Sequence, residues 1–317
     1  MNIDVVYLWC DDSDEQWRNK RLKYQQNIIA DKQAICEGRF IQNDELKYSL
    51  RSLAKYIPWI HNIFIVSDNQ IPQWLNLEHP KIKMIKHEDI IDTKYLPLFN
   101  SAAIETCISK IKGLSEYFIL MNDDMLFGDK INKSDLLDKN NFPLYRFTHY
   151  KANKNPTQYE IVTINMYNLN KRNFGYPDKL YFPHHNADLY CKSDYEECIK
   201  FYPELIEKTL CSRFRNEENW SRVLVQYFAL AHKHGTMKIV DDYKSSLWKW
   251  LKHYLFNFGH RDSRVISLSA NNYDKKMKHY HPKFFCMEDG EKCNNNDRIR
   301  AKNYLNKLFP EKCEFEK

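Results

Sequence analysis

The sequence predicts an α/β fold built on a mostly parallel, doubly wound sheet. Short β-branched and aromatic segments alternate with segments of helical spacing, and three of the strand-like segments end in acidic residues. Composition agrees, because 43% of the 317 residues are hydrophobic and 28% are charged, which suits a chain with a sizeable core. In sheets of this kind, ligands bind outside the carboxyl ends of the strands.

The first half of the chain supplies the predicted strands. Residues 3–9 (IDVVYLW) and 63–66 (IFIV) are rich in β-branched and aromatic residues, as buried strands are. Two further strands are expected at 82–85 and 117–121. The acidic residues that follow strands are Asp11 and Asp12, Asp68, and Asp123 and Asp124.

Helices are expected between these strands. Residues 15–35 carry apolar residues among charges, and 45–56 place Leu46, Leu50 and Leu53 on one face. Asn43 or Asp44 would cap the second helix. A third helix, 101–113, would begin after Pro97 and Asn100 and end at Gly113.

The second half is less regular. Residues 130–210 are rich in aromatics and show no clear pattern, whereas 216–234 have strong helical spacing. Residues 262–296 form a basic, Asn-rich stretch around the apolar run KFFCM. A final helix is expected over 296–308, before Pro310.

Composition also narrows the function classes. The formal charge is +6, from 48 Lys and Arg against 42 Asp and Glu. Basic and aromatic residues do not cluster in the sequence, so a nucleic-acid partner is not expected. Nine cysteines without a C-x-x-C motif predict reduced thiols in a cytoplasmic protein. The N-terminus does not resemble a signal peptide, and no apolar run approaches the roughly 20 residues that cross a membrane. No glycine-rich dinucleotide or P-loop motif occurs.

The stretch FILMNDDMLFG, residues 118–128, places two carboxylates between apolar runs. Asp123 and Asp124 could bind Mg²⁺ or Mn²⁺, which take oxygen ligands, or they could form a solvated turn. Asp4 lies inside the first strand. It either needs a buried partner or points to water at the strand edge.

Other residues suit phosphate binding and proton transfer. A helix that begins at Asn100 and Ser101 would offer free N–H groups, and Arg213 and Arg215 could bind phosphate oxygens. His184 or His185 could act as a base near neutral pH. An ordinary cap, a solvated charge cluster and packed histidines are the alternatives. Together, these residues fit phosphoryl or glycosyl transfer from a nucleotide-sugar.

The chain also resembles a known family. IDVVYLWCDDSD resembles the first conserved block of the Stealth proteins, and residues 39–76 resemble the second, which continues through YLPLFNSAAIE to FILMNDDMLF. PHHN and RFRNEENW resemble the third block, and KFFCMEDG the fourth. The order is the same, and the likeness covers almost the whole chain.

The resemblance implies a GT-A-like, Rossmann-like sheet flanked by helices in a single catalytic domain, residues 1–317. Residues 1–128 would form the nucleotide-sugar-binding half, 129–210 an irregular insertion, and 211–317 a helical part that completes the site. Asp4, His184 and Arg215 would be catalytic, and Asp123 and Asp124 would hold the cation. The residues expected to bind the donor are Arg39, Asn43, Arg51, Asn100, Ser101 and Asn122.

The activity implied by the resemblance is transfer of a sugar 1-phosphate, such as GlcNAc-1-phosphate, from a UDP-sugar to a sugar hydroxyl. UMP would leave, and the product would be a phosphodiester of a capsule or surface polysaccharide. Asn186 stands where the family often has a proline after the histidine, which leaves the choice between His184 and His185 open. A glycosyltransferase that releases UDP and an inactive polysaccharide-binding protein are the rivals. A cytoplasmic location is expected, with peripheral association with export machinery at the inner face of the membrane left open.

Overall fold

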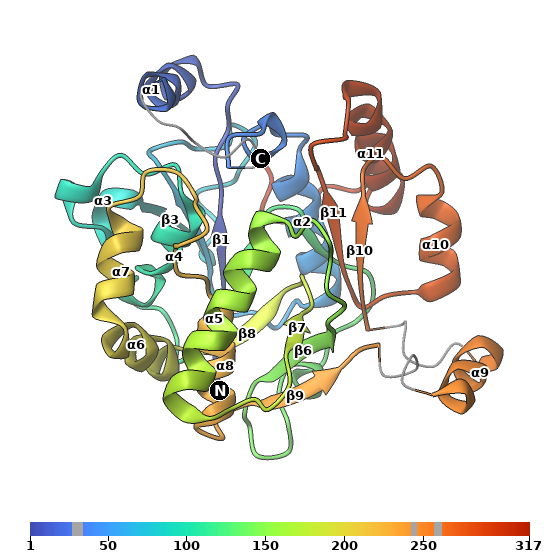
Figure 1. Ribbon diagram of the computed structural model, residues 1–317. Helices are drawn as coiled ribbons and strands as arrows, with labels where there is room; N and C mark the ends of the chain where they lie inside the picture. The colour runs from blue at the N-terminus through green and yellow to red at the C-terminus, as the bar shows by residue number, and fades with distance from the viewer. Residues whose placement is uncertain (27–33, 242–245, 257–261) are drawn as a thin grey trace.

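A five-stranded sheet lies at the centre of the molecule. The computed structural model describes residues 1–317 except 27–33, 242–245 and 257–261. The strand order is β3-β2-β1-β4-β8 (Figure 1). The first four strands are parallel and β8 is antiparallel to β4. The strands are β1 (Ile3–Leu8), β2 (Ile63–Ser67), β3 (Ile82–Lys86), β4 (Tyr117–Asn122) and β8 (Asp188–Cys191). The predicted mostly parallel α/β sheet is therefore confirmed.

Alternating residues of the strands pack into two separate cores, one on each face. Val5 and Tyr7 of β1 pack with α2 (Glu45–Tyr56), while Val6 packs on the other face with α4 (Ser101–Glu105). This period-two division explains why the strands are apolar throughout. The helices on the second face also include α5 (Gln158–Phe174), α6 (Lys192–Phe201), α7 (Pro203–Leu210) and α8 (Val223–Ala231).

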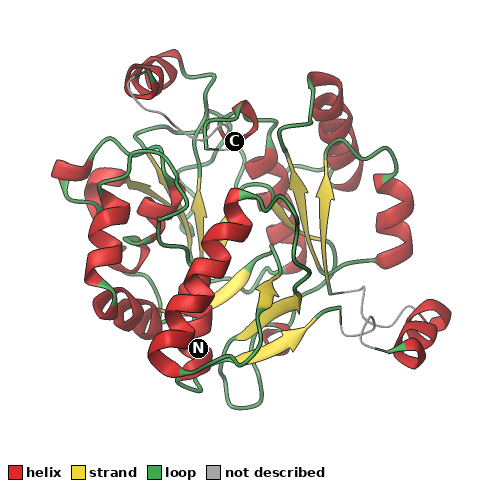
Figure 2. Cartoon of the chain, in the orientation of Figure 1, coloured by secondary structure: helices red, strands yellow, loops and turns green. Residues whose placement is uncertain are grey.

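Two smaller sheets extend the molecule (Figure 2). One has the order β10-β11-β5 and the other β7-β6-β9. Because β5 follows β4 after a two-residue turn, the chain passes from the central sheet directly into a second one. The strands are β5 (Met125–Phe127), β10 (Ser263–Ser267), β11 (Phe284–Glu288), β6 (Leu144–His149), β7 (Tyr181–Pro183) and β9 (Thr236–Ile239).

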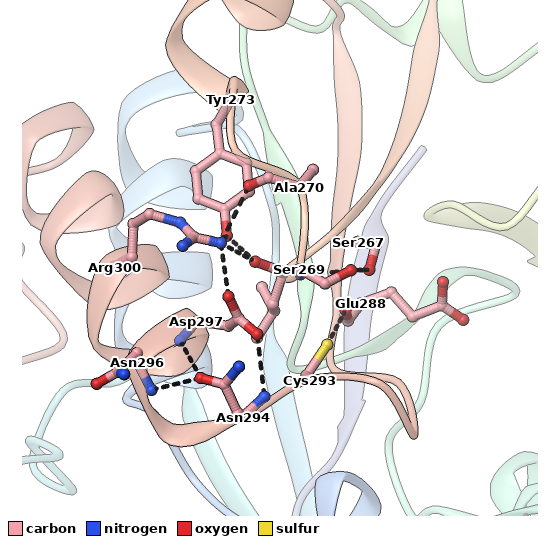
Figure 3. A network of polar contacts seen from close by, with 11 residues as sticks. Ser267, Ser269, Ala270, Tyr273, Glu288, Cys293, Asn294, Asn296, Asp297 and Arg300 are labelled. Carbon is pink, nitrogen blue, oxygen red and sulfur yellow. Dashed lines mark hydrogen bonds and ion pairs between the residues drawn. The ribbon is translucent and has the colours of Figure 1, made fainter.

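The remaining helices lie at the edges. They are α1 (Glu15–Gln25), α3 (His87–Ile90), α9 (Leu247–Phe256), α10 (Tyr273–Tyr280) and α11 (Asn295–Leu308). Arg300 of α11 donates to the carbonyl of Leu268 at 2.9 Å and to Asp297 at 2.7 Å, and Asn294 caps the helix (Figure 3). This network attaches α11 to the segment that follows β10.

Three predicted helices are shorter than expected. The first ends at Gln25, and its predicted continuation over 27–33 lies outside the described residues. Residues 101–113 form only a short helix to Glu105 and a 3₁₀ turn over 108–110. Residues 216–222 are not helical, because the Asn219 side chain accepts the N–H of Asn216 and Thr209 accepts the N–H of Trp220.

The segment that the sequence left unassigned is regular. It contains β6, α5, β7, β8, α6 and α7. For α5 the signals were present, since Thr157 and Glu160 form a capping box and Gly175 ends the helix with φ +69°.

Candidate active site

Asp123 and Asp124 form the turn between β4 and β5, at the carboxyl edge of the central sheet. Neither is fully exposed. Asp123 accepts the side-chain N–H of Gln42 at 2.6 Å. Asp124 accepts the thiol of Cys286 at 3.2 Å, whereas its Oδ1 atom is buried and has no hydrogen-bond partner among the described residues. A buried, unpartnered carboxylate oxygen is costly, so this atom is free to accept a ligand.

Asp124 lies in a group that suits a cation. Ligand atoms of Asp124, His185 and Cys286 all lie within 4.8 Å of one another. Burial, followed by the charge of Asp123, raises the pKa of Asp124 to about 7. Burial raises the pKa of the Cys286 thiol well above its ordinary value, so the thiol stays protonated at neutral pH. The carboxylate of Asp124, with its unpartnered Oδ1 atom, and the imidazole of His185 are suitable ligands for a divalent cation.

A third carboxylate, Glu45, lies next to this turn. It is buried at the start of α2 and accepts the side-chain N–H of Asn43 at 2.7 Å. Burial and the charge of Asp123 raise the pKa of Glu45 to about 8. Burial also raises the pKa of Asp123. Burial and mutual repulsion therefore make this group of acids harder to ionise, and a nearby positive charge would favour their ionised forms.

Beyond the turn, a pocket collects cationic side chains. Arg39, Arg215 and Arg222 line it, together with Ser101 and Asn122. Burial, followed by the charge of Arg39, lowers the pKa of Arg215 to about 9. Binding of an anion would stabilise the charged form of a guanidinium whose pKa is lowered in this way.

Glu105 and Arg222, which the sequence analysis did not identify, pair with each other in the lining of the pocket. Arg222 lies 3.4 Å from a carboxylate oxygen of Glu105 and 3.4 Å from the side-chain oxygen of Asn122. Glu105 is buried, and its segment SAAIE was singled out only as a helix start. Arg222 was hidden in the helix expected over 216–234.

The two adjacent histidines line the same pocket but face different partners. His184 Nδ1 lies 2.8 Å from the hydroxyl of Ser263, whereas His185 belongs to the group around Asp124. Burial, followed by Arg146, lowers the pKa of His184 to about 4, and burial and Arg222 lower that of His185 to about 3. Both imidazoles are therefore neutral at pH 7.

The structure brings most of the predicted residues to one region. Arg39, Ser101, Asn122, His184 and Arg215 line the pocket. Asn100 is fully buried behind it and caps α4 through the N–H of Ala102 at 3.1 Å. Asp123 and Asp124 form the adjoining turn, and Asn43 lies next in sequence to Gln42, which donates a hydrogen bond to Asp123.

Asp4 and Arg51 do not line the pocket, and both make contacts within the fold. Asp4 is at the amino end of β1, where its carboxylate accepts backbone N–H groups of Asn62 at 2.9 Å and Ser115 at 2.6 Å. Its need for a buried partner is thus met inside the fold. Arg51 binds Glu316 at 2.7 Å and the carbonyl of Phe309 at 2.7 Å, so it attaches the C-terminal segment to α2.

The other acidic strand ends do not reach the pocket either. Asp12 pairs with Arg21 of α1 at 2.9 Å, and Asp68 pairs with Lys20 of the same helix. Their charges are used to hold α1 at the sheet edge.

An α/β fold that brings acids, arginines and neutral histidines together around one pocket is typical of an enzyme. A family model described as "Stealth protein CR2, conserved region 2" matches residues 39–144. The capsular polysaccharide phosphotransferase fcs1 of Haemophilus influenzae is 32% identical over 306 residues, which cover 92% of this chain and 79% of that protein. The chain belongs to the Stealth family, and it is a phosphotransferase enzyme.

Two other relatives are also named phosphotransferases. The capsular polysaccharide phosphotransferase WcwK of Streptococcus pneumoniae is 28% identical, with 99% of this chain and 98% of that protein covered. The exopolysaccharide phosphotransferase cps2G of Lactiplantibacillus plantarum is 30% identical, over 72% of this chain and 75% of its own. Among solved structures, the galactosyltransferase LgtC in complex with donor and acceptor sugar analogs superposes with a TM-score of 0.43 at 8% identity, over 97% of this chain and 95% of its own.

Proposed function

We propose that the protein transfers a sugar 1-phosphate from a nucleotide-sugar to a sugar hydroxyl, in capsule or surface polysaccharide biosynthesis. The donor would be a UDP-sugar such as UDP-GlcNAc, and the products a phosphodiester and UMP. One observation carries the proposal: the turn with Asp123 and Asp124 directly follows Asn122, which lines a pocket together with Arg39, Arg215 and Arg222. A diphosphate with its cation could contact the carboxylates and the guanidinium groups at once.

Arg215 and Arg222 would hold the diphosphate. Arg215 is placed by Ser101, which its guanidinium contacts, and Arg222 by Glu105. Negative charge grows on the leaving phosphate as the bond between the phosphates breaks, and positioned guanidinium groups stabilise it.

His184 would take the proton of the acceptor hydroxyl. If Nδ1–H donates to Ser263, then Nε2 keeps its lone pair and can accept that proton. The acceptor oxygen forms a bond to the sugar-bearing phosphorus, and the bridging P–O bond breaks. Because the C–O bond at the sugar anomeric carbon is untouched, its configuration is retained.

A divalent cation, Mg²⁺ or Mn²⁺, would supply charge neutralisation for the diphosphate and the departing UMP. Asp124 and His185 would hold it, and Asp123 and Glu45 would add negative charge close by. We place the reaction in the cytoplasm, where nucleotide-sugars are made, with a saccharide or growing polysaccharide as acceptor.

The test is to identify the nucleotide product. The protein is incubated with a UDP-sugar, Mg²⁺ and a capsule-type acceptor, and nucleotides are separated by ion-exchange chromatography while ³¹P NMR follows the saccharide. UMP and a phosphodiester resonance are expected. UDP with no phosphorus in the saccharide would instead identify a metal-dependent glycosyltransferase, and unchanged donor would favour a binding protein.

A matched histidine pair makes the test specific. His184→Ala should lower UMP release by about a hundredfold or more, as loss of a general base does. His79→Ala is the control, because His79 is also partly buried but packs against Phe315 outside the pocket. Equal losses in both variants would contradict the role given to His184.

A further inference from the structure

Helix α9 carries five of the exposed large hydrophobic side chains of the described chain. Its sequence is LWKWLKHYLF. Leu247 is 73% exposed, Trp248 67% and Leu255 67%, and Trp250 and Leu251 are exposed as well. Figure 1 shows the helix standing apart from the body of the molecule, beyond β9 and β10. Apolar patches of this kind mark interaction surfaces.

The pattern of α9 is that of a helix lying on a membrane. Leu247, Leu251 and Leu255 recur every four residues and share one face, and two tryptophans flank that face. The helix also contains Lys249 and Lys252 and no acidic residue. Leucine and tryptophan on one side, with lysines elsewhere, are typical of interfacial helices on anionic lipid.

The length of α9 excludes a transmembrane role for it. Ten residues span about 15 Å, half of the hydrocarbon thickness of a bilayer. No helix among the described residues is long and apolar enough to cross a membrane. A short amphipathic helix can instead lie in the plane of the lipid headgroups.

The described residues Asp241 and Asp262, which lie on either side of α9 in the sequence, are both held by β6. Asp241, before the helix, accepts the backbone N–H of His149 at 2.9 Å. Asp262, after it, accepts Nε of the buried Arg146 at 2.9 Å. The next residue, Ser263, contacts His184. In the sequence, α9 ends seven residues before Ser263, which contacts a histidine of the pocket.

We propose that α9 seats the protein on an anionic phospholipid surface, with its leucines and tryptophans in the headgroup region and its lysines against lipid phosphates. The excess of lysine matches the charge of such a surface, which a second copy of this basic chain would not. The seat would hold the His184 side of the pocket near an acceptor that is itself attached to the membrane. This inference concerns binding and does not depend on which bond the enzyme breaks.

Vesicle flotation tests the proposal with the full chain. The protein should float with vesicles that contain phosphatidylglycerol, float poorly with pure phosphatidylcholine, and detach partly at high salt. The variant Leu247→Glu/Leu255→Glu should lower the partition coefficient by about tenfold or more, because it places charges in the apolar face. Lys249→Glu should reduce binding only to the anionic vesicles.

Leu77→Glu/Ile299→Glu is the matched control, because Leu77 and Ile299 are 43% and 51% exposed but lie outside α9. It should float like the unaltered protein. Turnover with a water-soluble acceptor should be unchanged in the α9 variants, which shows that they fold. Equal flotation of the α9 variant and the unaltered protein would overturn the proposal. So would light scattering that shows a lipid-free dimer lost in the α9 variant, together with no flotation of the unaltered protein, because the face would then bind a second copy.

Discussion

Asp123 and Asp124 are neighbours in sequence but differ in their surroundings. Asp123 is hydrogen-bonded to Gln42, whereas Asp124 faces His185 and Cys286 and keeps one oxygen without a partner among the described residues. The two acids therefore have separable roles. Asp124 is the better candidate for a direct ligand, and Asp123 for a nearby charge.

Asp124→Asn should abolish cation binding and lower turnover by about a hundredfold or more, because a bound cation contributes several kcal/mol of charge stabilisation. Binding of Mn²⁺ is measured by electron paramagnetic resonance and turnover by UMP release. The control Asp129→Asn changes an exposed acid that follows Gly128, outside the turn between β4 and β5. This control should alter neither Mn²⁺ binding nor turnover. Normal Mn²⁺ affinity in Asp124→Asn would reject Asp124 as a ligand.

Asp188 provides a test by pH. It is buried, accepts the Gln226 side chain at 2.8 Å, and has a second oxygen without a partner among the described residues. Burial raises its pKa from 3.8 to about 7. Between these values the folded protein keeps a proton that the unfolded chain has released, so the free energy of unfolding contributed by this group falls as pH rises from 3.8 to 7.

Asp188→Asn removes that dependence. The variant should be more stable than the unaltered protein at pH 8, by up to a few kcal/mol, and equal to it near pH 4. Asp138→Asn should behave in the opposite way, since bonds from Thr236 and two backbone N–H groups lower the pKa of Asp138 despite the opposing effect of burial. Urea unfolding at several pH values measures both; a loss of stability in Asp188→Asn at pH 8 would refute the burial argument.

At the scale of elements, Asn100 joins the start of α4 to the loop that carries Arg215. Its Nδ2 donates to the carbonyl of Ser212 at 2.8 Å and to the Asn219 side chain at 2.9 Å. Its Oδ1 caps the helix. One buried amide thus holds Ser101 and Arg215 in contact.

Asn100→Ala should cost about 1–3 kcal/mol of stability and raise the donor KM, since both the cap and the loop contacts are lost. Asn100→Asp keeps the cap acceptor but loses the two donated bonds. If the loop contacts matter for the site, Asn100→Asp should share the KM defect. Its stability should be higher at low pH, because an ionised carboxylate buried at this position would be repelled by the oxygens of Ser212 and Asn219. Thermal unfolding and initial rates separate the two effects. An unaltered KM in both variants would show that Asn100 is only a cap.

Helices and strands whose hydrophobic periodicity is continuous could be predicted from the sequence, whereas those with an interrupted or unclear periodicity could not. Strands β1 to β4, helix α2 and helix α11 agree with expectation because their periodicity continues over the whole element. The helix expected over 216–234 is shortened because Asn219, Thr209 and Asn216 offer the backbone other hydrogen bonds. Helix α5 was missed although its capping box was visible, because aromatic residues obscured its period.

At the scale of the whole molecule, the C-terminal segment is attached to α2. Arg51 and Glu316 form a two-pronged ion pair, at 2.7 and 2.8 Å, and their side chains are only 10% and 3% exposed. Phe315 is buried in the same core as β1. The last residues therefore close one face of the central sheet.

Arg51→Ala should lower the free energy of unfolding by about 3–5 kcal/mol, because it leaves Glu316 buried without its partner. Glu316→Gln retains much of the hydrogen bonding and should cost less. Chemical denaturation measures the loss, and kcat per folded molecule should change less than about twofold. A rise in donor KM without loss of stability would restore the substrate-binding role first expected for Arg51.

The sequence alone determined the α/β class, the family and most of the residues around the pocket, because strand periodicity and conserved-block patterns are written along the chain. Only the tertiary structure decided which acids matter. Asp12 and Asp68 turned out to pair with α1, Asp4 to close the opposite edge of the sheet, and Glu45, Glu105 and Arg222 to join the site. Most of these outcomes depend on contacts between segments that are distant in sequence. The ionisation state of a side chain, and the hydrogen-bonding atoms that it has left for a ligand, are set only when those partners pack around it.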